Sequence, residues 1–436
     1  MKCPDVLIIG GGPAGLACAN VLAQVGLYIL LVEQRDQLGG AINRVHIGTE
    51  QSTLKAPSRH KANWIDQLKQ LNTNAKYIQV WTSTIFLGVD QNHQCLLDRR
   101  EKGHVQGIKP RALVLALGAQ ELIFPKLGWE LPGVVTVGAM QVQLKETGRA
   151  PEGDVLIAGS GALPIALAAQ LCRVQRPPVA VIEAGKPILQ ALRNLDATWS
   201  VLKSKEHFFE VLEYAWSLIK SLVPYKTGWQ VLNVEPHSQR LKVTLINAVG
   251  KQKTFIVDHL ALHDGLIPNN AGLPVSGETG ALVIRAGDCQ EILGADGALI
   301  DGKRVAVKVA QHLGKKPPVF DWDPEINKAR CIQTSLGVLF KASSISTPAQ
   351  VVLCRCEGLK RSDLDQLKSL RSARELRLVG RYAMGLCQGR FCALAVQKVA
   401  AQSEIYFDKD SLLGRGQRWP LRPVSVTALA AYKEKL

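Results

Sequence analysis

Four of the ten cysteines stand close together near the end of the chain, in two pairs. Cys354 and Cys356 are separated by one residue, Cys387 and Cys392 by four, and 30 residues lie between the pairs. Four thiolates in one short stretch are the ligand set of a structural zinc ion or an iron–sulfur cluster. The Cys-x-Cys pair departs from the spacing that is usual for structural zinc, because both thiolates must reach one tetrahedral ion.

The segment around these cysteines contains local signals that would position them. Ser372 and Glu375 have the spacing of a capping box that opens a helix. A helix predicted over Phe391–Ala401 places Cys392 in its first turn, where the helix dipole favours a thiolate. Positive charge around an anionic cluster would come from Arg355, Arg381 and Arg390.

The other six cysteines stand singly among apolar residues, at positions 3, 18, 95, 172, 289 and 331, as buried free thiols do. The first residues run directly into an apolar strand, Val6–Ile9, which leaves no room for a signal peptide. We therefore expect a cytoplasmic protein without a disulfide framework. No window approaches the ~20 apolar residues of a membrane-spanning helix, so any attachment to the inner membrane would be peripheral, through an electron acceptor.

A glycine-rich turn near the start of the chain has the pattern of a dinucleotide site. Gly10-x-Gly12-x-x-Gly15 lies between the predicted strand Val6–Ile9 and a predicted helix, Leu16–Gln24. The first glycine permits a tight turn, the second lets the backbone approach a pyrophosphate, and the third lets helix and strand pack closely. The helix N-terminus adds N–H donors and a partial positive charge.

An acidic residue follows at the distance that this pattern requires. Glu33 lies 18 residues beyond Gly15, after the predicted strand Leu27–Val32, where a carboxylate can accept both ribose hydroxyls. Three further features favour FAD as the dinucleotide: the loop Leu38-Gly39-Gly40, the strand end at Leu115–Gly118, and Gly287-Asp288 on a short turn before the predicted helix Arg304–Leu313. The first suits a pyrophosphate, and the last suits a ribityl chain or a flavin phosphate.

A second unit with the same order of elements occupies residues 154–183. It keeps Gly159 and Gly161, but Pro164 stands where the third glycine would be. Glu183 could hold the ribose of NAD and would disfavour a 2′-phosphate. A fold that binds NAD and a fold that has lost nucleotide binding are equal alternatives at this point.

These stretches together resemble the flavoproteins with two dinucleotide-binding domains that include glutathione reductase and many NAD(P)H-dependent reductases. In that family the aspartate of a late Gly-Asp pair contacts the flavin ribityl chain. The redox disulfide of glutathione-reductase-like enzymes follows the flavin loop closely, and residues 38–60 contain no cysteine, so the disulfide-reductase function is excluded.

The cysteine segments carry a narrower resemblance. Leu353–Glu357 and Met384–Cys392 resemble the small [2Fe-2S] domain of bacterioferritin-associated-ferredoxin type. With Trp129–Gly133 and Arg422-Pro423, nearly the whole chain is similar to the A (α) subunits of opine oxidases, the B subunit of hydrogen cyanide synthase, and the α subunits of multimeric proline and hydroxyproline dehydrogenases. Leu378–Arg381 and Pro164 depart from that pattern.

The resemblance implies an oxidoreductase subunit that relays electrons. In such complexes a separate β subunit, similar to D-amino-acid oxidase, oxidises an amine or amino acid (an opine, D-amino acid, hydroxyproline, proline or glycine) at its own FAD. A small ferredoxin-like [2Fe-2S] subunit often completes the assembly, and an external acceptor receives the electrons. We find no acid–base pair or nucleophile and predict no catalytic residue.

The same resemblance implies the cofactors and their ligands. FAD would be bound by Gly10, Gly12, Pro13, Ala14, Gly15, Glu33, Gln34, Gly40, Ile85, Gly118, Gly287 and Asp288, and one [2Fe-2S] cluster by Cys354, Cys356, Cys387 and Cys392. Some α subunits of this family hold another adenine nucleotide. The second fold could therefore bind NAD, ATP or no nucleotide. FMN bound at a subunit interface is a further alternative.

The predicted fold is α/β, with two Rossmann-like dinucleotide-binding domains of the glutathione-reductase kind and a small helical C-terminal [2Fe-2S] domain. The predicted boundaries are 1–120 with 270–318 for a discontinuous FAD domain, 121–269 for the second nucleotide domain, 319–350 for a linker, 351–402 for the [2Fe-2S] domain and 403–436 for a tail that packs back on the flavoprotein. The aromatic helical insert, 196–222, indicates core packing first and a partner interface second.

Three other functions remain to be compared with the relay. They are a stand-alone NAD(P)H-dependent flavin reductase, a non-catalytic nucleotide-binding scaffold, and nucleic-acid binding suggested by the net charge of +16. The last is disfavoured, because no aromatic residues are interleaved with the basic ones and no recognition motif occurs. Residues 350–436 hold 16 Lys and Arg against 8 Asp and Glu. We expect this excess to offset an anionic cluster and to form a docking face for an acidic electron-transfer partner.

Overall fold

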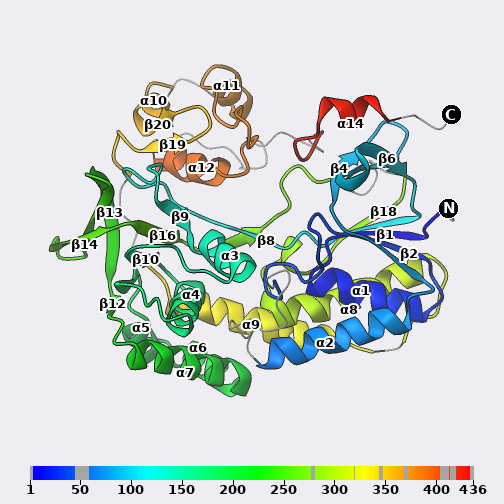
Figure 1. Ribbon diagram of the computed structural model, residues 1–436, viewed down its shortest axis with the longest axis horizontal. Helices are drawn as coiled ribbons and strands as arrows, with labels where there is room; N and C mark the ends of the chain where they lie inside the picture. The colour runs from blue at the N-terminus through cyan, green and yellow to red at the C-terminus, as the bar shows by residue number, and fades with distance from the viewer. Residues whose placement is uncertain are drawn as a thin grey trace.

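Two five-stranded parallel sheets form the body of the protein (Figure 1). The computed structural model describes residues 3–44, 58–275, 280–318, 320–342, 347–367, 372–402, 412 and 419–432. The strand order is β18-β7-β1-β2-β3 in the first sheet and β12-β11-β10-β16-β9 in the second. The predicted α/β architecture with two dinucleotide-type folds is confirmed.

The first sheet combines segments that are far apart in the sequence. Its strands are β1 (Val6–Ile9), β2 (Ile29–Val32), β3 (Ile78–Trp81), β7 (Ala112–Leu115) and β18 (Leu282–Arg285), and its helices are α1 (Pro13–Gln24), α2 (Ser58–Thr73) and α8 (Gly294–His312). An antiparallel sheet of β4 (Thr84–Val89), β5 (Cys95–Arg99) and β6 (His104–Ile108) follows β3. All four side chains of β1 are buried, as expected for a parallel strand covered on both faces.

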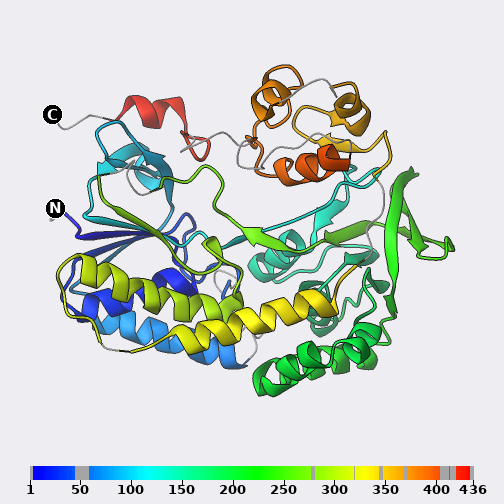
Figure 2. The same cartoon turned by 180° about the vertical axis from the view of Figure 1, so that it is seen from behind.

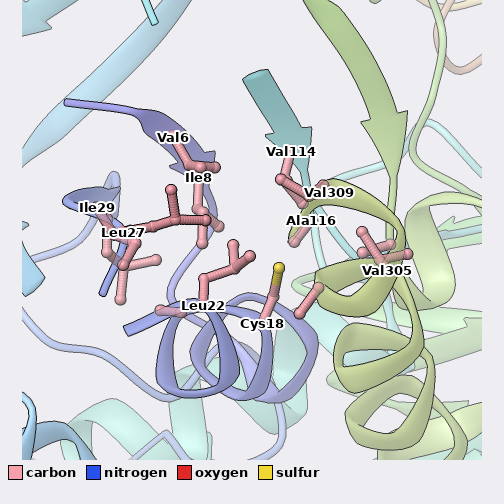
Figure 3. Packing of buried hydrophobic residues seen from close by; sticks show 14 of the residues in the cluster. Val6, Ile8, Cys18, Leu22, Leu27, Ile29, Val114, Ala116, Val305 and Val309 are labelled. Carbon is pink, nitrogen blue, oxygen red and sulfur yellow. The ribbon is translucent and has the colours of Figure 1, made fainter. Parts of the chain in front are cut away.

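The core of this domain lies between the sheet and the helices α1 and α8 (Figure 3). Cys18 and Leu22 of α1 pack in one cluster with Ile8 and Val114 of the sheet and with Val305 of α8. Cys18 is fully buried, as predicted for the singly placed cysteines. By contrast, Cys3 and Cys331 are exposed, because their segments lie at the surface.

The second sheet has a helical layer and an antiparallel sheet beside it. Its strands are β9 (Val134–Thr136), β10 (Val155–Gly159), β11 (Ala180–Glu183), β12 (Tyr225–Thr227) and β16 (His259–His263). Its helices are α3 (Val137–Thr147), α4 (Ala162–Arg173), α5 (Pro187–Arg193), α6 (Leu195–Lys203) and α7 (Lys205–Lys220). The antiparallel sheet contains β13 (Trp229–His237), β14 (Arg240–Asn247) and β15 (Gln252–Val257), and the pair β8 (Ala119–Glu121) and β17 (Leu266–Pro268) connects the two domains.

Two helices differ from the sequence-based expectation. α8 begins at Gly294, ten residues before the predicted start at Arg304. The proline-containing segment predicted as a linker contains the helix α9 (Asp323–Leu339), so that prediction was wrong for these residues. Pro324 occupies the first turn of α9, where a missing N–H does no harm, and the helix packs against α8 and α6.

The C-terminal part forms a small helical unit beside the second sheet (Figure 2). It contains β19 (Val352–Cys354), β20 (Leu359–Lys360), α10 (Arg361–Asp365), α11 (Ala373–Leu378) and α12 (Ala393–Gln402). Ser372 and Glu375 form the predicted capping box of α11. α12 begins at Ala393, so Cys392 precedes the helix instead of lying in its first turn, and its carbonyl accepts a hydrogen bond from the Val396 N–H (2.8 Å).

The end of the chain returns to the first domain. The Leu421 N–H donates to the Leu87 carbonyl of β4 (2.9 Å). Ala428, in the short helix α14 (Val426–Ala430), packs with Leu87 and Ile85. None of the helices in the described ranges is long and apolar enough to cross a membrane.

Candidate functional site

The carboxyl ends of four neighbouring strands in the first sheet stop at the same level. Ile9 is paired with Val32 on one side and with Leu115 on the other, and Leu115 is paired with Arg285. The residues just beyond these four ends include Gly10, Glu33, Gly118, Gly287 and Asp288. The carboxyl edge of a parallel α/β sheet is where such folds bind their ligands. The register therefore brings the main predicted nucleotide residues to one edge.

The first glycine turn is packed so closely that only glycine fits. A Cβ added to Gly15 would lie 1.9 Å from the Gly10 carbonyl oxygen, and Gly10 has a φ of +108°. A Cβ on Gly40 would lie 3.1 Å from the Gly12 Cα, so the predicted pyrophosphate loop reaches this turn. α1 begins at Pro13, whose missing N–H belongs to the unpaired first turn. The turn leaves backbone N–H groups of the helix N-terminus directed toward the sheet edge.

Glu33 lies against the glycine turn. Its carboxylate accepts the Gly11 N–H (2.8 Å) and the Arg35 N–H (3.1 Å), and the residue is 6% exposed. Gln34 is exposed beside it. The backbone of Ile85 lies close to Glu33, because the N–H of the adjacent Thr84 donates to the Glu33 carbonyl (3.0 Å). The Ile85 side chain, however, packs in the β4–β6 cluster and not at the sheet edge.

The Gly287-Asp288 turn is held by its own hydrogen bonds. The Asp288 carboxylate accepts the N–H groups of Leu293 (2.8 Å) and Gly294 (3.1 Å) at the start of α8. Burial raises the pKa of Asp288, and these two N–H donors act in the opposite direction. The Gly287 N–H donates to Asp301 (2.7 Å), which is 1% exposed. Asp301 was not predicted from the sequence; a carboxylate directly after the apolar run Ala298–Ile300 is the signal that could have identified it.

A segment of the same chain covers the second glycine turn. The Ser160 hydroxyl lies within hydrogen-bond distance of the Glu183 carboxylate (2.8 Å) and of the Phe340 carbonyl (2.5 Å). Gly185 forms an antiparallel bridge with Ala342. Glu183 also accepts the N–H groups of Gly161 and Gly185 and is 1% exposed, and this burial raises its pKa. The carboxylate predicted to hold a ribose is thus enclosed by its own chain.

The structure brings the four clustered cysteines together. The Cys392 thiol is hydrogen-bonded to the sulfurs of Cys354 and Cys387, and Cys387 also interacts with Cys356. The Cys392 contact lowers the pKa of Cys354 to about 6 and that of Cys387 to about 5, because the donated proton stabilises their thiolates. The same contacts raise the pKa of Cys392, and burial raises that of Cys356.

The backbone around these sulfurs donates hydrogen bonds to them. The N–H groups of Glu357 and Ala383 point to Cys354, and those of Gly389 and Phe391 point to Cys387. The loop that supplies these donors is strained: the non-glycine residues Arg381, Ala383 and Gln388 all have positive φ angles. Strain of this kind is maintained where the surrounding structure fixes a functional geometry.

The predicted arginines have different positions around the cysteines. Arg390 donates to the Cys387 carbonyl (3.2 Å), whereas Arg381 pairs with Glu357 (2.8 Å). Arg355 lies over the Trp129 ring, 5.0 Å from its centroid. Among the described His, Cys, Asp and Glu side chains, no three are arranged as ligands of a single metal ion. A [2Fe-2S] cluster takes four thiolates as two on each iron, so its demand on geometry differs from that of one zinc ion.

Three hydrogen bonds are among the contacts that join the cysteine unit to the rest of the molecule. The Gln120 amide donates to the Arg390 carbonyl (2.9 Å), and the Trp129 indole donates to the Val352 carbonyl (2.8 Å). The Arg390 guanidinium donates to the Leu421 carbonyl (2.7 Å) in the segment that returns to β4. Gln120 lies two residues after Gly118, so the cysteine unit is attached next to the edge of the first sheet.

Comparison with known proteins relates this chain to oxidoreductases. Residues 4–287 match the pyridine nucleotide-disulphide oxidoreductase family. The chain is 27% identical to the A subunit of opine oxidase from Rhizobium meliloti (strain 1021), over 98% of each chain. It is 25% identical to hydrogen cyanide synthase subunit HcnB of Pseudomonas protegens, over 88% of this chain and 89% of that one. The L-proline dehydrogenase of P. horikoshii has a similar fold, with a TM-score of 0.64 and 19% identity over 98% of this chain and 80% of that chain.

Proposed function

The chain belongs to the pyridine nucleotide-disulphide oxidoreductase family, and from this premise we propose that it is the FAD- and [2Fe-2S]-containing α subunit of a heteromeric amine or amino-acid dehydrogenase. In this role it relays electrons from the flavin of a substrate-oxidising β subunit to an external acceptor. The names of the relatives, the A subunit of opine oxidase and hydrogen cyanide synthase subunit HcnB, support a component of such an assembly.

The FAD is held at the edge of the first sheet. FAD supplies two-electron and one-electron redox chemistry when it is bound. Glu33 accepts the hydroxyls of the adenosine ribose, and the α1 N-terminus after Gly12 donates N–H groups to the pyrophosphate. Gly40 allows the opposite loop to approach the same phosphates. Asp288 is positioned by α8 to accept from the ribityl chain.

The four cysteines hold the cluster. A [2Fe-2S] cluster supplies a one-electron site when it is bound. The four sulfurs lie in contact with one another, and the backbone N–H donors around Cys354 and Cys387 suit a negatively charged group.

The contact between the two sites carries the proposal. Gln120 follows the strand end that includes Gly118, and Arg390 lies between Cys387 and Cys392. Their hydrogen bond of 2.9 Å fixes the cysteine unit beside the flavin domain, as one-electron transfer between bound groups requires. A stand-alone reductase would not need such a unit.

We propose the following partners. The first is a D-amino-acid-oxidase-like FAD β subunit, and the second is a small ferredoxin-like [2Fe-2S] subunit. The basic excess of residues 350–436 would guide an acidic electron-transfer partner to the cysteine unit. We place the assembly in the cytoplasm. Co-purification with the products of neighbouring reading frames, followed by a screen of D-amino acids, opines, glycine, proline and hydroxyproline, would identify the substrate.

Electron paramagnetic resonance of the purified chain tests the cofactor assignment. After reduction with dithionite, we expect a rhombic signal, iron and sulfide in equal amounts, and one flavin per chain. Replacement of a proposed ligand, Cys387→Ser, should remove the signal and leave the flavin. Cys331→Ser, which changes an exposed cysteine of α9, is the matched control and should leave both. Zinc in place of iron would contradict the proposal.

The alternative of a stand-alone NAD(P)H-dependent flavin reductase requires an open second fold. Phe340 and Ala342 lie across Ser160 and Gly185, where the nucleotide of such an enzyme would bind. We therefore propose that the second fold does not take NADH. Anaerobic mixing with NADH should leave the flavin oxidised; rapid bleaching by NADH alone would favour the reductase instead.

A further inference from the structure

Helices α5, α6 and α7 carry exposed apolar side chains that the proposed electron relay does not use. On α5 and α6 they are Ile188, Leu192, Leu195, Trp199 and Leu202; on α7 and just beyond it they are Phe209, Leu212, Trp216, Ile219 and Leu222. Successive members within each set are three or four residues apart, the spacing of neighbours on one side of a helix. We call these ten side chains the apolar stripe.

The apolar stripe is far more exposed than the surface of a soluble domain requires. Its members are between 44% (Leu202) and 88% (Leu222) exposed. If each side chain exposes on the order of 100 Å², the ten together expose on the order of 1,000 Å² of apolar surface. The largest apolar patch on a typical monomer covers about 300–600 Å². Apolar surface of this extent indicates a binding face.

The exposure is not caused by a missing core, because the inner sides of these helices are already packed. Tyr214 and Leu218 of α7 are buried in one cluster with Leu167 of α4. α6 packs against α9. α7 is therefore apolar on two sides, one facing its own domain and one facing outward. The outward side is not covered by the described part of the chain and is available to a binding partner.

The charges at the apolar stripe favour an anionic partner. Lysines mark its borders: Lys186 and Lys220 are exposed near its two ends, and the Lys203 ammonium lies 5.6 Å from the centroid of the Trp199 ring. Two acidic groups of α7 are engaged by residues of the protein: Glu210 accepts the Tyr214 hydroxyl (2.7 Å), and Glu213 pairs with Arg173. The outward side is thus apolar at its centre, and the three lysines at its border outnumber the exposed acidic group of α6, Asp196.

The hydroxyl groups of the same helices donate to backbone carbonyls of the protein, as Ser200 does to the Asp196 carbonyl (2.8 Å). Thr198 donates to the Ala191 carbonyl (2.9 Å), and Ser217 to the Ala169 carbonyl (3.4 Å). A protein–protein interface of this area usually carries about one hydrogen bond per 100–200 Å². Tryptophan and lysine around an apolar helical side, with hydroxyls satisfied internally, are instead the composition of helices that lie in the plane of a membrane surface.

We propose that the apolar stripe docks on the surface of a membrane that contains anionic phospholipid. The apolar side chains would enter the boundary between headgroups and acyl chains, while the lysines extend to lipid phosphates. α5, α6 and α7 lie at the opposite side of the molecule from the cysteine unit (Figures 1 and 2). Membrane docking therefore leaves the cysteine unit accessible to partner subunits.

Flotation with lipid vesicles tests the proposal with the full-length, cofactor-loaded chain. The wild-type protein should float with vesicles of phosphatidylglycerol and phosphatidylethanolamine, more weakly with phosphatidylcholine alone, and its tryptophan emission should shift to the blue. Trp199→Glu combined with Trp216→Glu should weaken flotation at least ~tenfold. Val249→Glu, at an 86% exposed position in the turn between β14 and β15, is the matched control and should float like the wild type.

Three outcomes would overturn membrane docking. The first is a wild-type protein that remains in the aqueous fraction with both lipids. The second is a concentration-dependent dimer that the double variant dissociates, which would make the apolar stripe an interface between two copies. The third is a complex with the β subunit that buries the tryptophans and does not float. Flavin content and the dithionite-reduced signal should be the same in the double variant and the wild type, so failure of the electron-relay proposal would be seen separately.

Discussion

The side-chain amide of Gln120 donates a 2.9 Å hydrogen bond to the backbone carbonyl of Arg390, across 270 residues of sequence. Gln120 belongs to β8, which starts directly after Gly118, and Arg390 separates two of the clustered cysteines. The bond thus connects the edge that we propose for the flavin with the unit that we propose for the cluster. A substitution of Gln120 would remove this bond without changing any residue that we propose as a cofactor ligand.

Gln120→Ala should loosen this attachment and slow electron transfer between flavin and cluster. Loss of one such bond costs about 1 kcal/mol, or about fivefold in the equilibrium constant between docked and undocked cysteine units. Flavin and iron contents should not change. Transient absorption after photoreduction of the flavin would measure the rate. Gln70→Ala, which removes an exposed bond to Asp66 on α2, is the control. An unchanged rate in Gln120→Ala would mean that the contact does not support the relay.

Gly15→Ala should abolish flavin binding and destabilise the first domain. The added methyl group would lie 1.9 Å from the Gly10 carbonyl oxygen, so the turn that precedes α1 has to open. Flavin absorbance per chain and thermal unfolding measure the two effects. Gly337→Ala is the matched control, because a Cβ there meets no atom within 4 Å. Alanine inside α9 should stabilise the helix by up to about 1 kcal/mol. Retention of FAD by Gly15→Ala would contradict the assigned site.

Local patterns account for what the sequence could predict. The glycine turn at Gly10 and the capping box at Ser372 are defined by residues a few positions apart, and both are found as predicted. The segment predicted as a linker failed because its prolines were interpreted as helix breakers, although Pro324 is compatible with the first turn of a helix. α9 is then stabilised by packing against α6 and α8, which lie at distant positions in the sequence.

Contacts between distant segments could not be predicted from composition or spacing. The Ser160–Phe340 contact spans 180 residues, and nothing in either local sequence indicates the other partner. The same holds for Asp301, whose carboxylate positions the Gly287 N–H. The spacing of the four clustered cysteines indicated their chemistry. The strained loop through Arg381 and Ala383, which supplies N–H donors to them, forms only in the folded unit and could not be predicted.

Lys145 should make the folded protein relatively more stable as the pH rises from about 8 to 10.5. Its ammonium donates to the Ala41 carbonyl (3.1 Å) and the Ile42 carbonyl (3.3 Å), beside the predicted pyrophosphate loop. Burial, with the nearby Arg44 as a smaller cause, lowers its pKa from 10.5 to about 8. The unfolded chain holds this proton more tightly, so loss of the proton between these pH values favours the folded state, by up to about 3 kcal/mol.

Denaturant unfolding of the wild type and of Lys145→Met over pH 7–11 measures this dependence. The difference in unfolding free energy between the two proteins should be constant below pH 8 and should rise in favour of the wild type up to about pH 10.5. Lys69→Met, at an exposed lysine of α2, is the control for general charge effects. A flat difference across the window would show that Lys145 is not buried as described.

Cys387→Ser should stop turnover of the assembled dehydrogenase while the β subunit still reduces its own flavin. Cys387 interacts with both Cys392 and Cys356, so its replacement removes a proposed iron ligand from the middle of the set. Amine-dependent reduction of an artificial acceptor, measured on the complete complex, should fall to the background of the complex without cluster. Cys331→Ser should retain wild-type turnover, because Cys331 is exposed on α9. Full turnover in Cys387→Ser would instead favour the scaffold function, in which the bound nucleotide is structural and the electrons take a path outside this chain.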